Sequence, residues 1–164
     1  DRNKLAHIIK KIKSAKSSAL ISDAGTPAIS DPGSVLISEC IKNEIQIIPI
    51  PGASALMSAL VISGFKIDSF IFEGFLPQKK GREKKLKEIA SDKETIILYE
   101  SVYRIEKLLN ELVKYMPNKF VIICKELTKK FEEVWRGFPK DLIKEIPKHK
   151  LKGEFVVILV EHGS

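Results

Sequence analysis

The 164-residue sequence has few of the side chains that form disulfides or bind transition metals. Its two cysteines, Cys40 and Cys124, lie far apart in the chain and form no pair with metal-ligand spacing. Its three histidines show neither H-x₃₋₅-H nor H-E-x-x-H spacing, the patterns that bring imidazoles together on one metal ion. The sequence therefore predicts two buried free thiols and no metal site.

Long apolar runs and the common nucleotide-binding motifs are also absent. The longest apolar run, FVVILV at 155–160, is as long as a strand and far short of the roughly 18 residues of a membrane span. No signal-peptide pattern opens the sequence. The two free thiols are typical of a cytoplasmic protein, which is the location we expect. No G-x-x-x-x-G-K-[ST] or G-x-G-x-x-G occurs, and GASAL at 52–56 lacks the last glycine of a G-x-S-x-G elbow. These absences leave a phosphate-cradling nucleotide site without support and argue against a hydrolase.

Positive charge is in excess. Lys and Arg number 28 against 21 Asp and Glu, which gives a net charge of +7. Such a balance favours a polyanionic partner such as RNA, although many basic proteins bind no nucleic acid. With 44% apolar and 30% charged residues, the composition is typical of a globular protein of one domain or two small lobes.

The first part of the chain alternates short apolar runs with helical patterns. We expect a helix to about residue 16, a strand at 18–22, a helix at 34–43, a strand at 45–50 and a helix within 51–64. Asp31 or Ser34 could cap the second of these helices. Strands and helices in alternation predict a parallel sheet in an α/β lobe.

The pattern changes after Gly64, where strands follow one another without regular intervening helices. The expected strands are 69–74, 95–101, 119–126, 132–138 and 153–161, with helices after the basic loop 77–85, at 103–116 and at 139–146. We therefore expect a mixed sheet and divide the chain into an N-terminal lobe, 1–66, and a C-terminal lobe, 67–164.

Two segments of the first lobe have the composition of ligand-binding loops. SDAGTPAISDPG at 22–33 has twelve residues, about twice the usual connection, and PGASAL at 51–56 combines a glycine with small residues at a helix start. Each follows an expected strand, and ligands of open α/β sheets bind where strands end. The alternative reading, a plain turn followed by helix formers, stays open for the second segment.

Polar segments of the second lobe also allow two readings. LYESVYR at 98–104 could contact a ligand or could be a helix start capped by Ser101. PQKKGREKK at 77–85 and CKELTKKFEEVWRG at 124–137 could be solvated faces or a basic rim for RNA phosphates.

Taken in order, SDAGTPAISDPG, PGASAL, FEGFLPQKKGR, ETIILYESVYR, KELTKKFEEVWRG and KGEFVVILVE resemble the tetrapyrrole methylase family, and within it the members that methylate ribosomal RNA. The resemblance covers essentially the whole chain. It implies an S-adenosylmethionine-dependent enzyme that methylates the ribose 2′-hydroxyl of a cytidine in small-subunit ribosomal RNA. It also implies an α/β fold of two lobes with the cofactor in the cleft between them, and a homodimer.

The resemblance also implies roles for particular residues. The segment 25–29 matches the family's cofactor loop, and the expected cofactor contacts are Asp23, Gly25, Thr26, Ile29, Ser54, Ala55, Tyr99 and Gly153. Because a ribose hydroxyl is a poor nucleophile, a base or a cation beside it would help. The candidates are Glu100, Arg104 and Glu126, with Lys125 beside them. The expected contacts to RNA phosphates are Lys79, Lys80, Arg82, Lys84 and Lys85.

In one respect the sequence departs from the family. The family's first strand and its first Gly/Pro-containing loop have no counterpart ahead of Asp1, so we expect a fragment that begins inside the first lobe. Its sheet would then expose an edge that favours association. Two other functions stay open: a methyltransferase acting on a tetrapyrrole, and a noncatalytic RNA-binding module.

Overall fold

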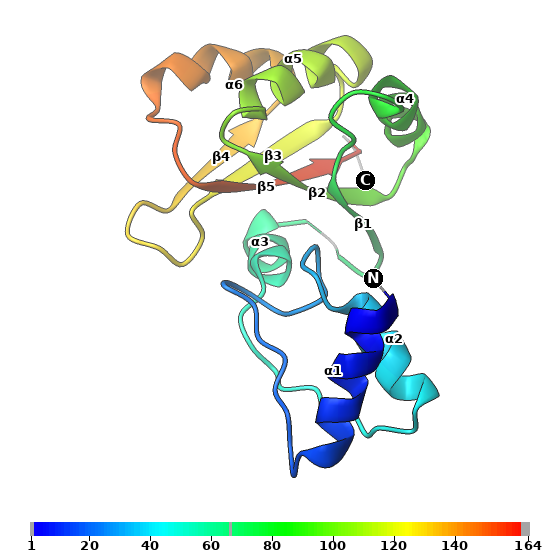
Figure 1. Ribbon diagram of the computed structural model, residues 1–164. Coiled ribbons are helices and arrows are strands. Elements are labelled where there is room, and N and C mark those ends of the chain that lie inside the picture. Colours follow the sequence, from blue (N-terminus) through cyan, green and yellow to red (C-terminus); the bar gives the residue numbers. More distant parts are fainter. Residues whose placement is uncertain (1, 66, 162–164) are drawn as a thin grey trace. The chain divides into compact units, whose positions relative to one another are not determined.

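The computed structural model describes residues 2–65 and 67–161 and divides the chain into two compact units, Asp1–Ser54 and Ala55–Ser164 (Figure 1). We describe each unit by itself. The division precedes the helix α3 (Ala55–Ser63), whereas the sequence placed that helix in the first lobe. The reason is packing, because Leu56, Ala59 and Leu60 of α3 are buried in a core cluster with strand residues of the second unit.

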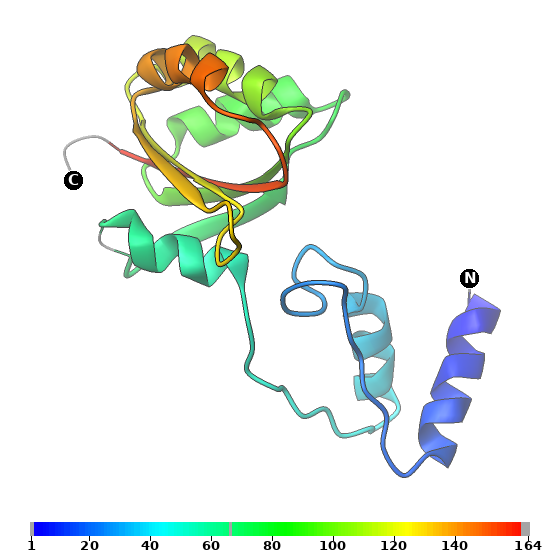
Figure 2. The same ribbon diagram turned by 90° about the vertical axis from the view of Figure 1, so that its left-hand side faces the viewer.

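The first unit contains two helices, α1 (Arg2–Ser14) and α2 (Ser34–Lys42), which lie side by side (Figure 2). Lys13 Nζ on α1 donates a hydrogen bond of 2.9 Å to Asn43 Oδ1 at the end of α2. The expected cap by Asp31 or Ser34 is wrong: α2 follows Gly33, and no side chain caps it.

The strands expected at 18–22 and 45–50 are not formed, and both segments are extended chain without strand pairing in the described residues. A strand is stabilised by its neighbour, which satisfies its backbone N–H and C=O groups. Neither segment has such a neighbour here, and their apolar side chains stay exposed, as in Ile21 (84%) and Ile50 (80%). An apolar run favours a strand, but it forms one only where another strand lies beside it to pair with.

The second unit is built on a five-stranded sheet, which confirms the expected mixed sheet. Its strands are β1 (Phe70–Phe75), β2 (Thr95–Ser101), β3 (Phe120–Lys125), β4 (Glu133–Gly137) and β5 (Glu154–Val160), in the order β1-β2-β5-β3-β4. The pair β1–β2 is parallel, and the other three pairs are antiparallel. Since β2 and β3 are both antiparallel to β5, they run in the same direction. The carboxyl ends of β1, β2 and β3 therefore meet at one edge of the sheet.

Helices cover both faces of this sheet (Figure 1). On one face lie α4 (Arg82–Ser91), α5 (Ile105–Tyr115) and α6 (Pro139–Glu145), which continues into a 3₁₀ turn (Ile146–Lys148); α3 lies on the other. Strands covered on both faces need apolar side chains at nearly every position. This explains the continuous apolar runs of β2, β3 and β5.

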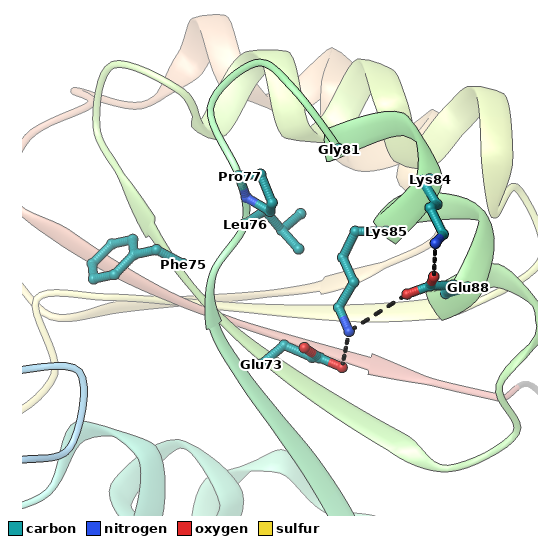
Figure 3. A pocket seen from close by; sticks show the side chains of 8 residues that line it. All are labelled: Glu73, Phe75, Leu76, Pro77, Gly81, Lys84, Lys85 and Glu88. Carbon is teal, nitrogen blue, oxygen red and sulfur yellow. Dashed lines mark ion pairs between the residues drawn. The ribbon is translucent and has the colours of Figure 1, made fainter. Parts of the chain in front are cut away.

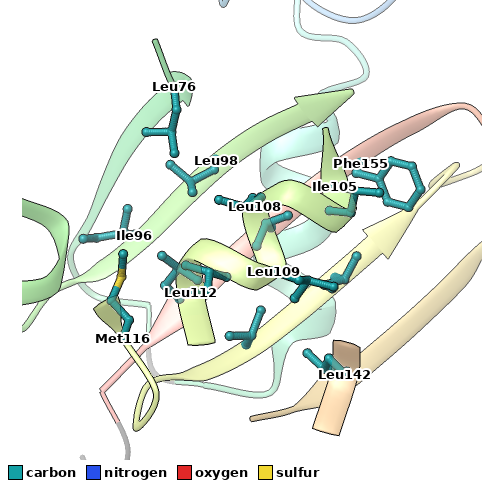
Figure 4. Close-up of a cluster of buried hydrophobic side chains, with 14 of the residues drawn as sticks. Leu76, Ile96, Leu98, Ile105, Leu108, Leu109, Leu112, Met116, Leu142 and Phe155 are labelled. Carbon is teal, nitrogen blue, oxygen red and sulfur yellow. The ribbon is translucent and has the colours of Figure 1, made fainter. Parts of the chain in front are cut away.

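Each face of the sheet has its own hydrophobic cluster. Toward α5, Leu108, Leu109 and Leu112 pack on Leu98 and Phe155, among others, and all five are buried (Figure 4). Toward α3, the alternate strand residues Ile97, Ile122 and Ile158 pack on Leu56 and Leu60. Successive side chains of a strand point to opposite faces, so neighbouring residues of β2 belong to different clusters.

Candidate functional site

The expected catalytic residues lie at the edge where β2 and β3 end. Glu100 on β2 and Lys125 on β3 are both paired with Phe155 of the intervening strand β5, so the three residues form one row across the sheet. Glu126 follows Lys125 directly, and Gly153 precedes β5 at the same edge. The fold therefore brings together segments that are more than twenty residues apart in the chain.

Arg82 differs from the expectation that it contacts RNA phosphates. Its side chain is only 4% exposed, and its Nε and Nη2 atoms bind both carboxylate oxygens of Glu111 at 2.7–2.9 Å. Its Nη1 donates to Pro77 O at 3.1 Å, and its Nη2 lies 3.5 Å from Glu100 Oε2. Burial lowers the pKa of Arg82, but the hydrogen bond and the charge of Glu111 outweigh it, and the pKa is raised. We therefore interpret Arg82 as a structural residue.

Glu100 is enclosed by the same network. Its side chain is 1% exposed, and its Oε1 accepts hydrogen bonds from Arg104 Nε at 2.7 Å and from the backbone N–H of Ser101 at 2.8 Å. A buried carboxylate with two arginines beside it has its charge compensated inside the protein. Glu100 is thus placed to position Arg104, whose side chain is 25% exposed. Ser101 is not the helix cap that one reading proposed, because α5 begins after Arg104 without a side-chain cap.

Glu126 and Gly153 form a second local arrangement. The Glu126 N–H donates to Glu154 O at 3.0 Å, and the Glu154 N–H donates to Glu126 Oε1 at 3.1 Å. Lys129 Nζ also donates to Glu126 Oε1, at 2.9 Å, and this bond is the main cause of a lowered pKa of Glu126. Gly153 has φ +88°, and a Cβ there would overlap the Glu126 carboxylate. A glycine is therefore required beneath Glu126.

Tyr99 lies on the opposite face from Glu100, because the two are neighbours on β2. Its hydroxyl accepts a hydrogen bond of 3.2 Å from the backbone N–H of Leu56, directly after Ala55. Its ring packs edge-on against Phe72 and Phe75, at centroid distances of 5.0 and 5.7 Å. The structure thus brings together two expected cofactor residues, Ala55 and Tyr99, at the start of α3.

The two loops expected to bind a cofactor meet in the first unit. Thr26 Oγ1 in the 22–33 loop donates a hydrogen bond of 3.0 Å to Ala53 O in the segment that precedes Ser54. Ala28 and Ser30 have φ values of 69° and 61°, a left-handed conformation that costs non-glycine residues roughly 1–3 kcal/mol. Asp23 and Ile29 are exposed on the same loop. Strained backbone beside exposed polar and apolar side chains fits a ligand with both polar and aromatic parts, such as S-adenosylmethionine.

The basic loop divides into free and compensated charges. Lys79, Lys80 and Lys84 are exposed, and Lys84 Nζ lies 3.9 Å from Glu88. Lys85 Nζ lies 2.7 Å from Glu73 and 3.8 Å from Glu88 (Figure 3). These ion pairs line a pocket of about 360 Å³ in which two lysines face two glutamates. The pocket thus has little net charge with which to attract a phosphate.

A cluster on β3 and β4 was not predicted from the sequence. Glu133 Oε1 accepts a hydrogen bond of 2.5 Å from Lys125 Nζ, and Glu133 Oε2 accepts one of 3.1 Å from Trp135 Nε1. His149 Nδ1 lies 2.8 Å from Glu133 Oε2. The Trp135 and His149 rings pack at a centroid distance of 4.3 Å. Glu133 and Trp135 alternate on one strand, which is a weak signal of a shared face. Lys125 is 4% exposed and bound to Glu133, so its ammonium group is not available to a substrate and the expectation of a catalytic role is wrong.

Two features are not found in the described part of the chain. No group of three or more His, Cys, Asp or Glu side chains there is arranged to hold a metal ion. Nor do these residues include a helix with the length and apolar character needed to cross a membrane.

Comparison with family models decides the classification. Residues 1–143 match the model described as Tetrapyrrole (Corrin/Porphyrin) Methylases. The chain belongs to the tetrapyrrole methylase family. The resemblance found in its loops is thereby confirmed.

Within the tetrapyrrole methylases, the chain is similar to proteins named ribosomal RNA small subunit methyltransferase I. It is 43% identical to the one from Halalkalibacterium halodurans over 158 residues, covering 96% of this chain and 55% of the relative. It is 46% identical to the one from Hydrogenobaculum sp. over 159 residues, covering 96% and 69%. The chain thus spans a little over half the length of the first of these relatives.

Solved structures of other proteins show a similar fold. Diphthine synthase matches with a TM-score of 0.71 and 16% identity, covering 98% of this chain and 67% of that one. Uroporphyrin-III C-methyltransferase from Thermus thermophilus, complexed with S-adenosyl homocysteine, matches with a TM-score of 0.66 and 13% identity, covering 98% and 73%. These likenesses confirm the predicted α/β fold class.

Proposed function

We propose that the protein carrying this chain methylates the ribose 2′-hydroxyl of a cytidine in small-subunit ribosomal RNA, with S-adenosylmethionine as the methyl donor. The observation that carries the proposal is the 43% identity, over 96% of the chain, to a protein named ribosomal RNA small subunit methyltransferase I. Exposed lysines on the 77–85 loop support a polyanionic substrate. A tetrapyrrole substrate has no comparable support, because the solved tetrapyrrole-modifying relatives are similar in fold at low identity.

S-adenosylmethionine, when bound, would supply an electrophilic methyl group on a sulfonium that serves as the leaving group. The task of the protein is therefore mainly alignment, which can supply about 7–11 kcal/mol of the barrier. In the first unit, Thr26 holds the 22–33 loop against Ala53, and we assign Asp23, Gly25, Ile29 and Ser54 to the cofactor. Contacts of Ala55, Tyr99 and Gly153 with the cofactor stay predictions.

The substrate hydroxyl needs a hydrogen-bond acceptor. We assign this role to Glu126, whose side chain is 18% exposed, rather than to Glu100, which is 1% exposed. Because the pKa of Glu126 is lowered, first by Lys129, its carboxylate is ionised at neutral pH and accepts a hydrogen bond from the hydroxyl. Arg104, held by Glu100, supplies a cation for the neighbouring phosphate or the developing alkoxide.

The decisive experiment is transfer of a labelled methyl group by the full-length protein. Unmethylated small ribosomal subunits and uroporphyrinogen serve as acceptors side by side. We expect label at a ribose 2′-oxygen of a cytidine. Label on the macrocycle alone would overturn the substrate, and salt-sensitive RNA binding without cofactor binding would favour a noncatalytic module.

Two variants test the assigned catalytic residues in the same protein. We expect Glu126→Gln and Arg104→Met each to lower the rate constant of methyl transfer by about 10²-fold or more, the usual range for such groups, while the Kd for S-adenosylmethionine is unchanged. The matched control is Glu145→Gln. Glu145 is the last residue of α6, and its carboxylate pairs with Lys148 in the 3₁₀ turn that follows. Full activity of Glu126→Gln would exclude Glu126 as the acceptor.

Charge reversal tests the basic loop. We expect Lys79→Glu, Lys80→Glu and Lys84→Glu together to weaken RNA binding and leave cofactor binding intact, because these side chains are exposed and lie on the 77–85 loop. The measurements are the Kd values for an RNA fragment and for S-adenosylmethionine. Equal loss of both would contradict this division of roles.

We further propose a cytoplasmic homodimer, as the family resemblance implies. Exposed Ile21, Ile48 and Ile50 offer apolar surface for association. Sedimentation of the full-length protein would show a dimer, and a monomer at micromolar concentration would contradict this part of the proposal.

A further inference from the structure

A second groove of the second unit lies between α4 and α5. It has a volume of about 370 Å³, and its charged lining consists of Lys79, Arg82, Glu83, Lys107, Glu111 and Lys114. We call it the α4–α5 groove. Lys107 and Lys114 belong to α5, outside the basic loop that the sequence singled out.

Most of the negative charge in this groove is already compensated. Arg82 binds both oxygens of Glu111, and Glu83 pairs with Lys87 at 2.9 Å. Lys107 Nζ lies 4.0 Å from Glu111, a longer distance than that of Arg82. The lining thus has four basic side chains against two acidic ones, whereas the pocket in Figure 3 has two of each.

Three lysines, Lys79, Lys107 and Lys114, face the groove from two sides. Lys107 and Lys114 are seven residues apart on α5, so they share one face and lie about 10.5 Å apart along the helix axis. Lys114 Nζ is held by the Tyr115 hydroxyl at 2.9 Å and lies 4.6 Å from the centre of its ring. Lys79 lines the groove from the loop before α4.

We propose that the α4–α5 groove binds the phosphodiester backbone of the RNA that flanks the target nucleotide. The proposal deepens the proposed function and rests on it, because the partner is the RNA substrate. In double-stranded DNA, successive phosphates of one strand rise about 3.4 Å along the axis. On that scale, a row of about 10.5 Å on α5 is long enough to face more than one phosphate of a nucleic-acid strand. Arginine and lysine contacts of this kind position a nucleic acid without reading its sequence.

The test compares two pairs of lysines in the full-length protein. Lys107→Gln with Lys114→Gln removes two charges from the groove, and Lys140→Gln with Lys144→Gln removes two exposed charges from α6. The Kd for a fragment of small-subunit ribosomal RNA is measured over a series of salt concentrations. Each lost phosphate contact lowers the salt slope of log K by about 0.7–0.9.

We expect the groove pair to lower the slope by about 1.4–1.8 and the α6 pair to leave it nearly unchanged. The Kd for S-adenosylmethionine and the melting temperature of both pairs should equal those of the natural protein. Equal salt slopes for the two pairs would overturn the proposal. It would also be overturned if substitution of Lys107 and Lys114 weakened the binding of polyglutamate but not the binding of RNA.

The same experiment separates failure of the groove from failure of the proposed function. If the natural protein methylates the RNA and the groove pair behaves like the α6 pair, the groove is wrong and the function stands. If the natural protein methylates no ribosomal acceptor but the groove pair still lowers its salt slope for RNA, the groove stands and the methylation is wrong.

Discussion

Similar apolar sequences are buried in the second unit of the chain and exposed in the first. In the second unit the TIIL run of β2 is inserted between two strands and covered on both faces, so Ile97 is fully buried. In the first unit the IQIIPI run at 45–50 is also mostly apolar, yet Ile48 is 68% exposed. The difference teaches that an apolar run acquires its structure from the elements that pair with it and cover it.

The largest expected difference in the free energy of unfolding is between a buried and an exposed ion pair, because burial decides how much the loss of one partner costs. Arg82→Met leaves Glu111 without its bidentate partner and leaves the buried Glu100 with Arg104 as its one remaining arginine, so it should lower the free energy of unfolding by about 3–5 kcal/mol. Lys42→Met removes an ion pair whose side chains are 68% and 32% exposed and should change it by less than about 1 kcal/mol. Urea unfolding of this chain, followed by circular dichroism, measures both. Equal effects would show that the Arg82 network is solvated.

The two apolar runs can be compared by one substitution at matched isoleucines. Ile97→Ala leaves a cavity between two packed layers and should cost about 2–5 kcal/mol. Ile48→Ala removes an exposed side chain from this chain and should stay within about 0.5 kcal/mol. The same urea experiment applies. A cost at Ile48 near that at Ile97 would show that the 45–50 segment is packed in solution.

A glycine comparison isolates the close approach at the candidate site. Gly153→Ala adds a Cβ that overlaps Glu126 and should cost about 1–3 kcal/mol. Gly64→Ala has a similar φ of +81° with no neighbour within 4 Å, so it measures the conformational strain alone. We expect the larger loss of stability, and a rise in the pKa of Glu126 by NMR titration, for Gly153→Ala. Equal losses would mean that Glu126 moves aside at no cost.

The smallest effect concerns pH. Lys125, followed by Trp135 and His149, lowers the pKa of Glu133 below its ordinary 4.5. A carboxylate with a lowered pKa stabilises the fold above its ordinary pKa, and this contribution is lost as the pH falls through the lowered value. Glu133 is 34% exposed, and a Gln at this position keeps an acceptor for Lys125, so Glu133→Gln should cost about 1 kcal/mol at pH 7. The difference from the natural chain should shrink below about pH 4.5. Melting temperatures from pH 7 to 3 measure this. A constant difference would contradict it.

Local patterns in the sequence predicted most of the second unit. The periodic leucines of α5 and the apolar runs of β2, β3 and β5 were correct because each element carries its own signal. Pairing and burial of charges were not predictable in the same way. Arg82 stands in a run of basic residues, and its partner Glu111 lies twenty-nine positions further on, so nothing local distinguishes it from the exposed Lys84. Lys107 and Lys114 of the α4–α5 groove could not be predicted either, because nothing in the pattern of the amphipathic helix α5 distinguishes them from other exposed lysines.

The place of β5 has a consequence for synthesis. It is the last strand of the sheet in chain order, yet it lies at the centre, between β2 and β3. A ribosome releases the chain from its N-terminus at about 5–20 residues per second, so β2 and β3 leave the exit tunnel before the strand that joins them. Until Glu154–Val160 emerges, their inner edges are open to other nascent chains. The sheet therefore cannot close before β5 has been synthesised, and a chaperone that shields unpaired strands would act on this protein before that point.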